Sequence, residues 1–242
     1  MKAVLLPALL LQVPAPQPFQ EAAAALARAQ RWAELRSLCE ATLATRPEDP
    51  LGQTYLALVH LAEGRLPEAT RLAEAAARAE PRRPLAWWVL GLSHLQAGRL
   101  PQAVDSGRKL GELDPGLAFE YFGKPALVRA MGGEGALPFV ARPALKPTLQ
   151  PSAPPYPESA RHRGIQGDVV LDILIDGDGT PLVVAPVWGP PELVPTAVAY
   201  LKRWRFPQRT GPLRFRFAMD FKLVINPGPY QRAPEAVYDL PR

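Results

Sequence analysis

The sequence contains little that would support catalysis, a metal site or disulfide bonding. Cys39 is the only cysteine among the 242 residues, so no internal disulfide can form. Of the three histidines, His60 and His94 occupy equivalent positions and have no second metal ligand at helical spacing, and His162 is expected on the surface. The sequence has no phosphate-binding Gly-Lys-Ser/Thr loop, zinc-protease helix or nucleophile elbow. We therefore expect a protein that binds other molecules, is not an enzyme and needs no cofactor.

Long apolar runs are also absent. The apolar run Ala3–Leu11 follows Lys2 and precedes Val13-Pro14-Ala15, a pattern typical of a secretory signal. The run is about half of the roughly 20 apolar residues that a membrane-spanning helix needs. The sequence therefore predicts a signal peptide over residues 1–15 and export without a permanent membrane anchor.

Neither sign of charge dominates the chain. There are 28 Lys and Arg residues and 23 Asp and Glu residues, and Arg and Glu alternate through the first half as they do on solvated helix faces. The cationic run Lys202–Arg216 is interrupted at the spacing of a buried core by Trp204, Phe206, Phe215 and Phe217. Buried aromatic side chains cannot stack on bases. We expect neither nucleic acid nor a small-molecule substrate as a partner.

Proline recurs every 34 residues in the first half of the chain, at Pro47, Pro81 and Pro115, and the same offset relates Gly64 to Gly98. A fixed period of this length indicates stacked pairs of helices. In the last copy the pattern predicts helices over Pro84–Gln96 and Pro101–Leu113, with Gly98 between them.

The residue types at the repeated positions resemble tetratricopeptide repeats. Small residues at these positions let paired helices approach closely, and we expect Gly64 and Gly98 to stand at such tight contacts. We assign residues 18–131 to about three repeats; the first is atypical, because Gln30 occupies the glycine position. The resemblance is carried by Trp87, Leu90, Gly91, His94, Gly98, Ala103, Leu110 and Pro115 in the last copy, and by Leu56, Ala57, His60, Gly64, Ala69, Ala73, Ala76 and Pro81 in the middle copy.

This resemblance implies a concave groove lined by the first helix of each pair. If Trp87 takes the packing position, Trp88 lies about 100° further round the helix, toward the groove. The alternative is that these residues are covered by a following helix, predicted over Leu117–Met131. The candidate groove residues are Thr54, Leu58, Trp88, Leu92 and Leu95.

The composition changes after Met131, where glycines are followed by a proline every few residues up to Pro157. We predict an extended linker over residues 132–150 that separates two domains. A second domain is expected over residues 151–226, with an irregular tail over residues 227–242.

The second domain has the pattern of a small sheet with one helix. Apolar and acidic residues alternate in a strand from Gly167 to Asp176, and Asp176-Gly177-Asp178-Gly179 is suited to a tight hairpin turn. The returning strand, Leu182–Trp188, contains two prolines, so it should be an edge strand or carry a bulge. A helix follows over Pro195–Trp204, and the last strand should span Leu213–Ile225, where apolar residues alternate strictly.

This strand, strand, helix, strand order resembles the TonB C-terminal domain. The expected fold class is therefore α+β, an all-α tetratricopeptide superhelix followed by a ββαβ domain with a three-stranded antiparallel sheet. The resemblance rests on Tyr156-Pro157, Ala160, Gly164-Ile165-Gln166-Gly167, Val169, Asp176, Asp178-Gly179, Leu193 and Trp204-Arg205-Phe206-Pro207.

By resemblance, the family couples an inner-membrane motor to outer-membrane transport by adding a transporter's short peptide as an extra strand. This chain has helical repeats where energy transducers have a long spacer, and it lacks an anchor helix. We therefore expect a periplasmic protein-protein interaction adaptor that contacts membranes only through its partners. The candidate residues at the partner-binding strand edge are Arg214, Arg216, Ala218, Asp220 and Lys222. The alternative is a periplasmic assembly or secretion factor that acts mainly through the repeat groove.

Overall fold

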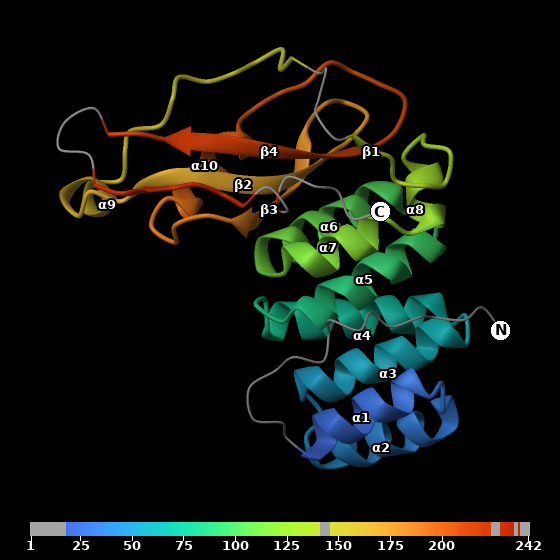
Figure 1. Ribbon diagram of the computed structural model, residues 1–242. Coiled ribbons are helices and arrows are strands. Elements are labelled where there is room, and N and C mark those ends of the chain that lie inside the picture. Colours follow the sequence, from blue (N-terminus) through green and yellow to red (C-terminus); the bar gives the residue numbers. More distant parts are fainter. Residues whose placement is uncertain (1–17, 141–145, 224–227, 235–236, 238–242) are drawn as a thin grey trace. The chain divides into compact units, whose positions relative to one another are not determined.

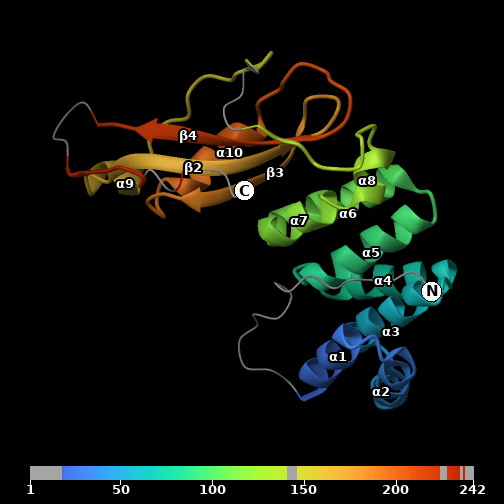
Figure 2. The ribbon, with the colours of Figure 1, turned by 45° about the vertical axis from the view of Figure 1, so that its right-hand side comes forward.

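The structure is a computed structural model that describes residues 18–140, 146–223, 228–234 and 237. The expected signal peptide over residues 1–15 lies outside these ranges, as do the last two residues of the expected final strand, Val224 and Ile225. The chain divides into two units, Met1–Tyr121 and Phe122–Arg242, the first helical and the second built on a sheet (Figures 1 and 2).

The first unit is a stack of helix pairs. Each pair packs against itself and against the next, and α3 also contacts α5. The first helices of the second and third pairs begin at Pro50 and Pro84 and end just before Gly64 and Gly98, because proline suits the first helical turn and glycine suits the end. The helices of the pairs are α1 (Pro18–Arg28), α2 (Trp32–Thr45), α3 (Pro50–Ala62), α4 (Leu66–Ala79), α5 (Pro84–Gln96) and α6 (Leu100–Leu113).

The turn within each pair has the same backbone conformation in all three copies. Gly64 and Gly98 have φ values of +77° and +73°, and Gln30 at the equivalent position has a φ of +54°. A Cβ added at Gly64 or Gly98 would meet nothing within 4 Å. The expectation of a tight contact there is therefore wrong: these glycines are favoured because the left-handed conformation suits them.

The close contact in the last repeat lies instead at Gly91. A Cβ at this position would lie 2.6 Å from the hydroxyl oxygen of Tyr121, which donates a hydrogen bond of 2.8 Å to the carbonyl of Ala103. Tyr121 belongs to α7 (Pro115–Phe122), which is followed by α8 (Pro125–Ala130). The single helix expected over Leu117–Met131 is thus two helices, because Pro125 begins a new helix and cannot continue the previous one.

The second unit contains β2 (Gln166–Ile175), β3 (Pro181–Trp188), α10 (Val194–Lys202) and β4 (Leu213–Phe221), in the expected order. The strands β3, β2 and β4 are antiparallel neighbours, and β3 lies at one edge with register shifts against β2, as its prolines predicted. The hairpin turn is closed by Asp176, whose carboxylate accepts a 2.7 Å hydrogen bond from the N–H of Thr180.

One face of this sheet packs against α10 to form the core of the unit. Aromatic rings meet across it: the Trp204 ring lies 5.3 Å from that of Phe217, and the Phe206 ring lies 5.2 Å from that of Phe215. The apolar residues that alternate along β2 and β4 supply the rest of this core. Every second side chain of β4 therefore points inward.

The sheet is larger than the three strands predicted. β1 (Phe139–Val140) pairs in parallel with β4, and β5 (Tyr230–Gln231) pairs in parallel with β2. Parts of the expected linker and of the expected irregular tail therefore belong to the sheet. The strand expected over Leu213–Ile225 ends at Phe221. A short helix, α9 (Glu158–His162), precedes β2.

Candidate partner-binding edge of the sheet

Beyond Phe215, no described strand pairs with the outer edge of β4. The N–H of Arg214 donates a 3.0 Å hydrogen bond to the carbonyl of Pro138, so its backbone faces away from β2. Backbone groups of successive strand residues point to alternate sides, so those of Ala218 and Asp220 face the same outer edge. β1 pairs only with Arg214 and Phe215. The part of the edge from Phe217 to Phe221 is thus placed to accept an added strand.

An apolar groove of about 340 Å³ lies beside this part of the edge. β4 forms one wall and the segment Gln150–Tyr156 forms another, while α10 and the residues after it contribute Tyr200 and Trp204. Its volume falls within the range of about 300–1,000 Å³ that is common for ligand pockets. The lining residues are Gln150, Ala153, Pro154, Tyr156, Tyr200, Trp204, Phe217, Ala218, Met219, Asp220, Phe221 and Lys222.

Hydrogen bonds hold the Gln150–Tyr156 wall at both ends. The Tyr200 hydroxyl donates to the carbonyl of Pro151 at 3.0 Å and accepts from the Gln150 amide at 3.3 Å. The Tyr156 hydroxyl donates to the carbonyl of Ile165. Prolines in this wall lack an N–H and cannot form a regular ladder with β4. The wall therefore borders the edge without closing it.

Arg214 and Arg216, two of the candidate edge residues, both pair with an acidic residue of the neighbouring strand. Their side chains lie on the face of the sheet opposite α10, where Arg214 Nη2 is 2.9 Å and Arg216 Nε is 2.7 Å from the carboxylate of Asp172. Asp172 is 5% exposed, and its hydrogen bond raises the pKa of Arg216 above its usual value. Both arginines are committed to a carboxylate 42 and 44 residues away in sequence. Both charges are therefore already paired within the chain.

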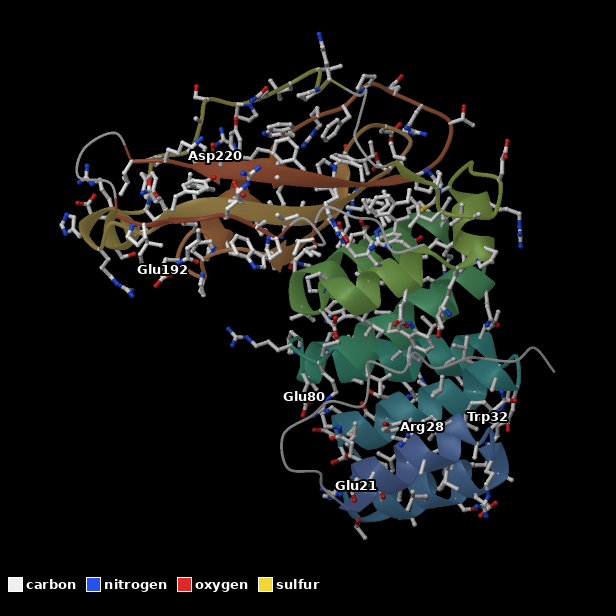
Figure 3. The ribbon with its side chains drawn as sticks, in the orientation of Figure 1. Glu21, Arg28, Trp32, Glu80, Glu192 and Asp220 are labelled. Carbon is white, nitrogen blue, oxygen red and sulfur yellow. The ribbon has the colours of Figure 1, made fainter. Side chains whose placement is uncertain are left out.

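The other two charged candidates also have partners within the chain. Asp220, whose side chain stands on β4 (Figure 3), accepts a hydrogen bond from the Tyr230 hydroxyl and lies 2.5 Å from the Lys222 ammonium. The Tyr230 hydroxyl also contacts Asp168, which accepts a 3.1 Å hydrogen bond from the N–H of Ala233. The tail thus covers this face of the sheet. The part of β4 that remains for a partner is its backbone around Ala218.

The repeat groove is also different from the expectation. Thr54, Leu58 and Trp88 are fully buried, Leu92 is 6% exposed, and Leu95 alone of the five candidates is partly exposed. The residue expected to pack, Trp87, is instead half-buried and donates its indole N–H to the carbonyl of Pro81 at 2.8 Å. Here α7 packs on α5 at Gly91, one turn from Trp88. Four of the five candidate side chains therefore lie in the interior of the helical unit.

The two repeat-equivalent histidines are structural. His60 and His94 are 9% and 6% exposed, and Nδ1 of each has no hydrogen-bond partner among the described residues. Burial is the largest cause that lowers the pKa of both imidazoles, followed by Arg65 for His60 and Arg99 for His94. Both are therefore suited to the neutral form.

Sequence reasoning did not identify the groove itself. Gln150, Tyr156, Tyr200 and Phe217 line it, but they are brought together from three segments that are far apart in sequence. In the sequence, Tyr156 stands out only as part of the resemblance to the TonB C-terminal domain. No periodicity in the sequence signals that its hydroxyl fixes a wall beside β4.

A stack of helix pairs joined to a small sheet with an accessible edge defines a protein of the interaction-module class. Residues 152–223 match the family model for the Gram-negative bacterial TonB protein C-terminal, and residues 54–118 match that for the tetratricopeptide repeat. The chain thus carries a TonB C-terminal domain preceded by tetratricopeptide repeats. A search of curated proteins finds no match to the chain.

The two matched families support a protein-interaction role in the cell envelope, and neither is a family of enzymes. The repeat match covers the middle and last copies and leaves out the first, which is the copy with Gln30 at the glycine position. Within the residues that the structure describes, no helix combines the length and apolar character needed to span a membrane.

Proposed function

We propose that this chain is an exported adaptor that binds an extended segment of an envelope protein by adding it as a strand to the outer edge of β4. The observation that carries the proposal is the position of the groove beside the unpaired edge around Ala218. Strand addition supplies affinity through backbone hydrogen bonds, and neighbouring pockets supply specificity through alternate side chains. Outer-membrane transport proteins are the partners that the family resemblance favours.

The groove favours an apolar or aromatic side chain at the partner position that faces α10. Tyr156, Tyr200, Trp204 and Phe217 border this space, and aromatic contacts of this kind contribute area and a preferred geometry. Arg214 and Arg216 give no reason to favour an acidic partner, because both already pair with Asp172. An assembly factor that acts through the repeat groove is likewise disfavoured, because the residues that would line the groove are buried.

Ala218→Pro tests strand addition. The substitution removes one outward N–H from β4 and leaves the core side chains unchanged. Synthetic peptides that cover periplasmic segments of the host's outer-membrane receptors should bind the wild type. Ala218→Pro should lower the affinity of the most tightly binding peptide by at least about tenfold. Ala218→Val is the matched control, because it keeps the N–H and suits a strand.

Circular dichroism must first show that both variants are folded. Equal affinities for wild type and Ala218→Pro would refute the proposed edge. Export is tested separately by fractionation: the proposal requires the chain in the periplasm, and recovery from the cytoplasm would contradict it.

A further inference from the structure

A segment of the chain itself already occupies the first part of the β4 edge. β1 runs parallel to β4, with Phe139 opposite Arg214 and Val140 opposite Phe215. The Arg214 N–H bonds the Pro138 carbonyl at 3.0 Å, and the Arg214 guanidinium carbon lies 5.0 Å from the centre of the Phe139 ring. β1 is therefore attached to the edge in the same manner as an incoming peptide.

β1 is held weakly, but the chain before it is held firmly. Phe139 is half-buried and does not belong to the core between the sheet and α10. By contrast, Gly133 is packed so closely that an added Cβ would lie 2.7 Å from a methyl carbon of Val128 and 3.3 Å from the ring of Pro212. A two-residue strand whose Phe139 lies outside the core can open locally at low free-energy cost. Such opening would leave the Gly133 anchor and the sheet core in place.

We propose that β1 is a displaceable internal competitor of the partner strand. This inference rests on the proposed function, since it concerns the same edge. A partner that pairs only with Phe217–Phe221 binds beside β1, whereas one that also pairs with Arg214 must displace it. β1 thereby lowers the affinity for longer strands and sets how much of β4 a partner can use.

Hydrogen exchange on the full chain tests the displacement without any ligand. The Arg214 amide, which faces β1, should exchange through local opening at least about 100-fold faster than the Phe217 amide, which faces β2. Val140→Pro should speed the exchange of the Arg214 amide further. It removes the N–H of Val140, which parallel pairing directs at the carbonyl of Arg214. Ala136→Pro is the control, since it places a proline in the same segment outside the strand. Equal protection of Arg214 and Phe217 in the wild type overturns the proposal.

Affinity provides the second readout, with a receptor peptide from the Ala218→Pro experiment that is long enough to pair with Arg214 as well as with Phe217–Phe221. Val140→Pro should raise its affinity about fivefold, which corresponds to about one hydrogen bond that the partner gains. Unchanged affinity in Val140→Pro, together with loss of binding in Ala218→Pro, overturns competition by β1 but supports strand addition. If no peptide binds to any variant, strand addition itself is wrong, and the exchange of Arg214 alone decides whether β1 opens.

Discussion

Gln30 allows the repeat geometry to be tested at one backbone position. It is the only non-glycine residue with a positive φ in the described chain, and Gly64 and Gly98 occupy the equivalent positions in the other copies. The same bonds surround all three positions: the next N–H, from Arg31 in the first copy, bonds a carbonyl five residues back, at 2.9 Å in each case. The substitution Gln30→Gly therefore restores the repeat consensus without altering any of these bonds.

The expected gain is modest and can be derived from the backbone alone. The left-handed conformation costs an L-residue about 1–2 kcal/mol, and glycine avoids this cost. Glycine also makes the unfolded chain more flexible, which lowers the free energy of unfolding by about 0.5–1 kcal/mol and offsets part of this gain. The Gln30 side chain is exposed, and within the part of the chain that the structure describes no hydrogen bond to it would be lost. We expect Gln30→Gly to stabilise the helical unit by about 0.5–1 kcal/mol, or roughly 2–5 °C in Tm.

Thermal unfolding of the full chain, followed by helical circular dichroism, measures this shift. The reverse changes, Gly64→Ala and Gly98→Ala, should destabilise by about 1 kcal/mol each, because the added methyl contacts nothing and the effect is confined to the backbone. Gln30→Ala keeps the left-handed penalty and should not raise Tm. A lower Tm for Gln30→Gly, or unchanged Tm values for both glycine variants, would refute this account of the turn.

Two further predictions concern the packed interior of the same unit. Gly91→Ala should destabilise it by about 1–3 kcal/mol in urea unfolding, since the methyl group would push the Tyr121 ring away; an effect below 0.5 kcal/mol would contradict the observed contact. The lowered pKa values of His60 and His94 mean that the unfolded state binds protons first, so stability should be constant above the unfolded pKa near 6.5 and fall as pH drops below it. Replacing both histidines by Gln should make Tm less dependent on pH between about pH 7 and pH 5. If Tm still falls as steeply in this range, other groups cause the loss of stability.

The sequence was most informative where a pattern extended over many residues. The 34-residue period predicted the helix Pro84–Gln96 with its observed bounds, and alternating residues predicted β2 and most of β4. It was least informative for contacts between distant segments. Two-residue strands such as β1 carry no periodic signal, and nothing local to Arg216 indicates that Asp172 will pair with it across the sheet.

Trp87 and Trp88 show a second limit of pattern reasoning. The repeat consensus assigns the packing role to the first tryptophan, but the structure buries the second. In this chain Trp88 is fully buried, and Tyr121 of α7 packs against Gly91, one turn further along α5. Contacts of this kind join residues about 30 positions apart, so the consensus of a single repeat does not report them.

The charges and the backbone of β4 lead to one mechanistic conclusion. Alternation places Phe215 and Phe217 in the core and directs the arginines to a face where both pair with Asp172. On the proposed function, the outward backbone around Ala218 is then the group that meets a partner. Recognition through backbone groups is largely independent of the partner's sequence. Discrimination among partners must then come from the aromatic groove and from the length of edge that β1 leaves open. A substitution in the groove, such as Tyr200→Ala, should therefore change which peptides bind, whereas Ala218→Pro should weaken all of them.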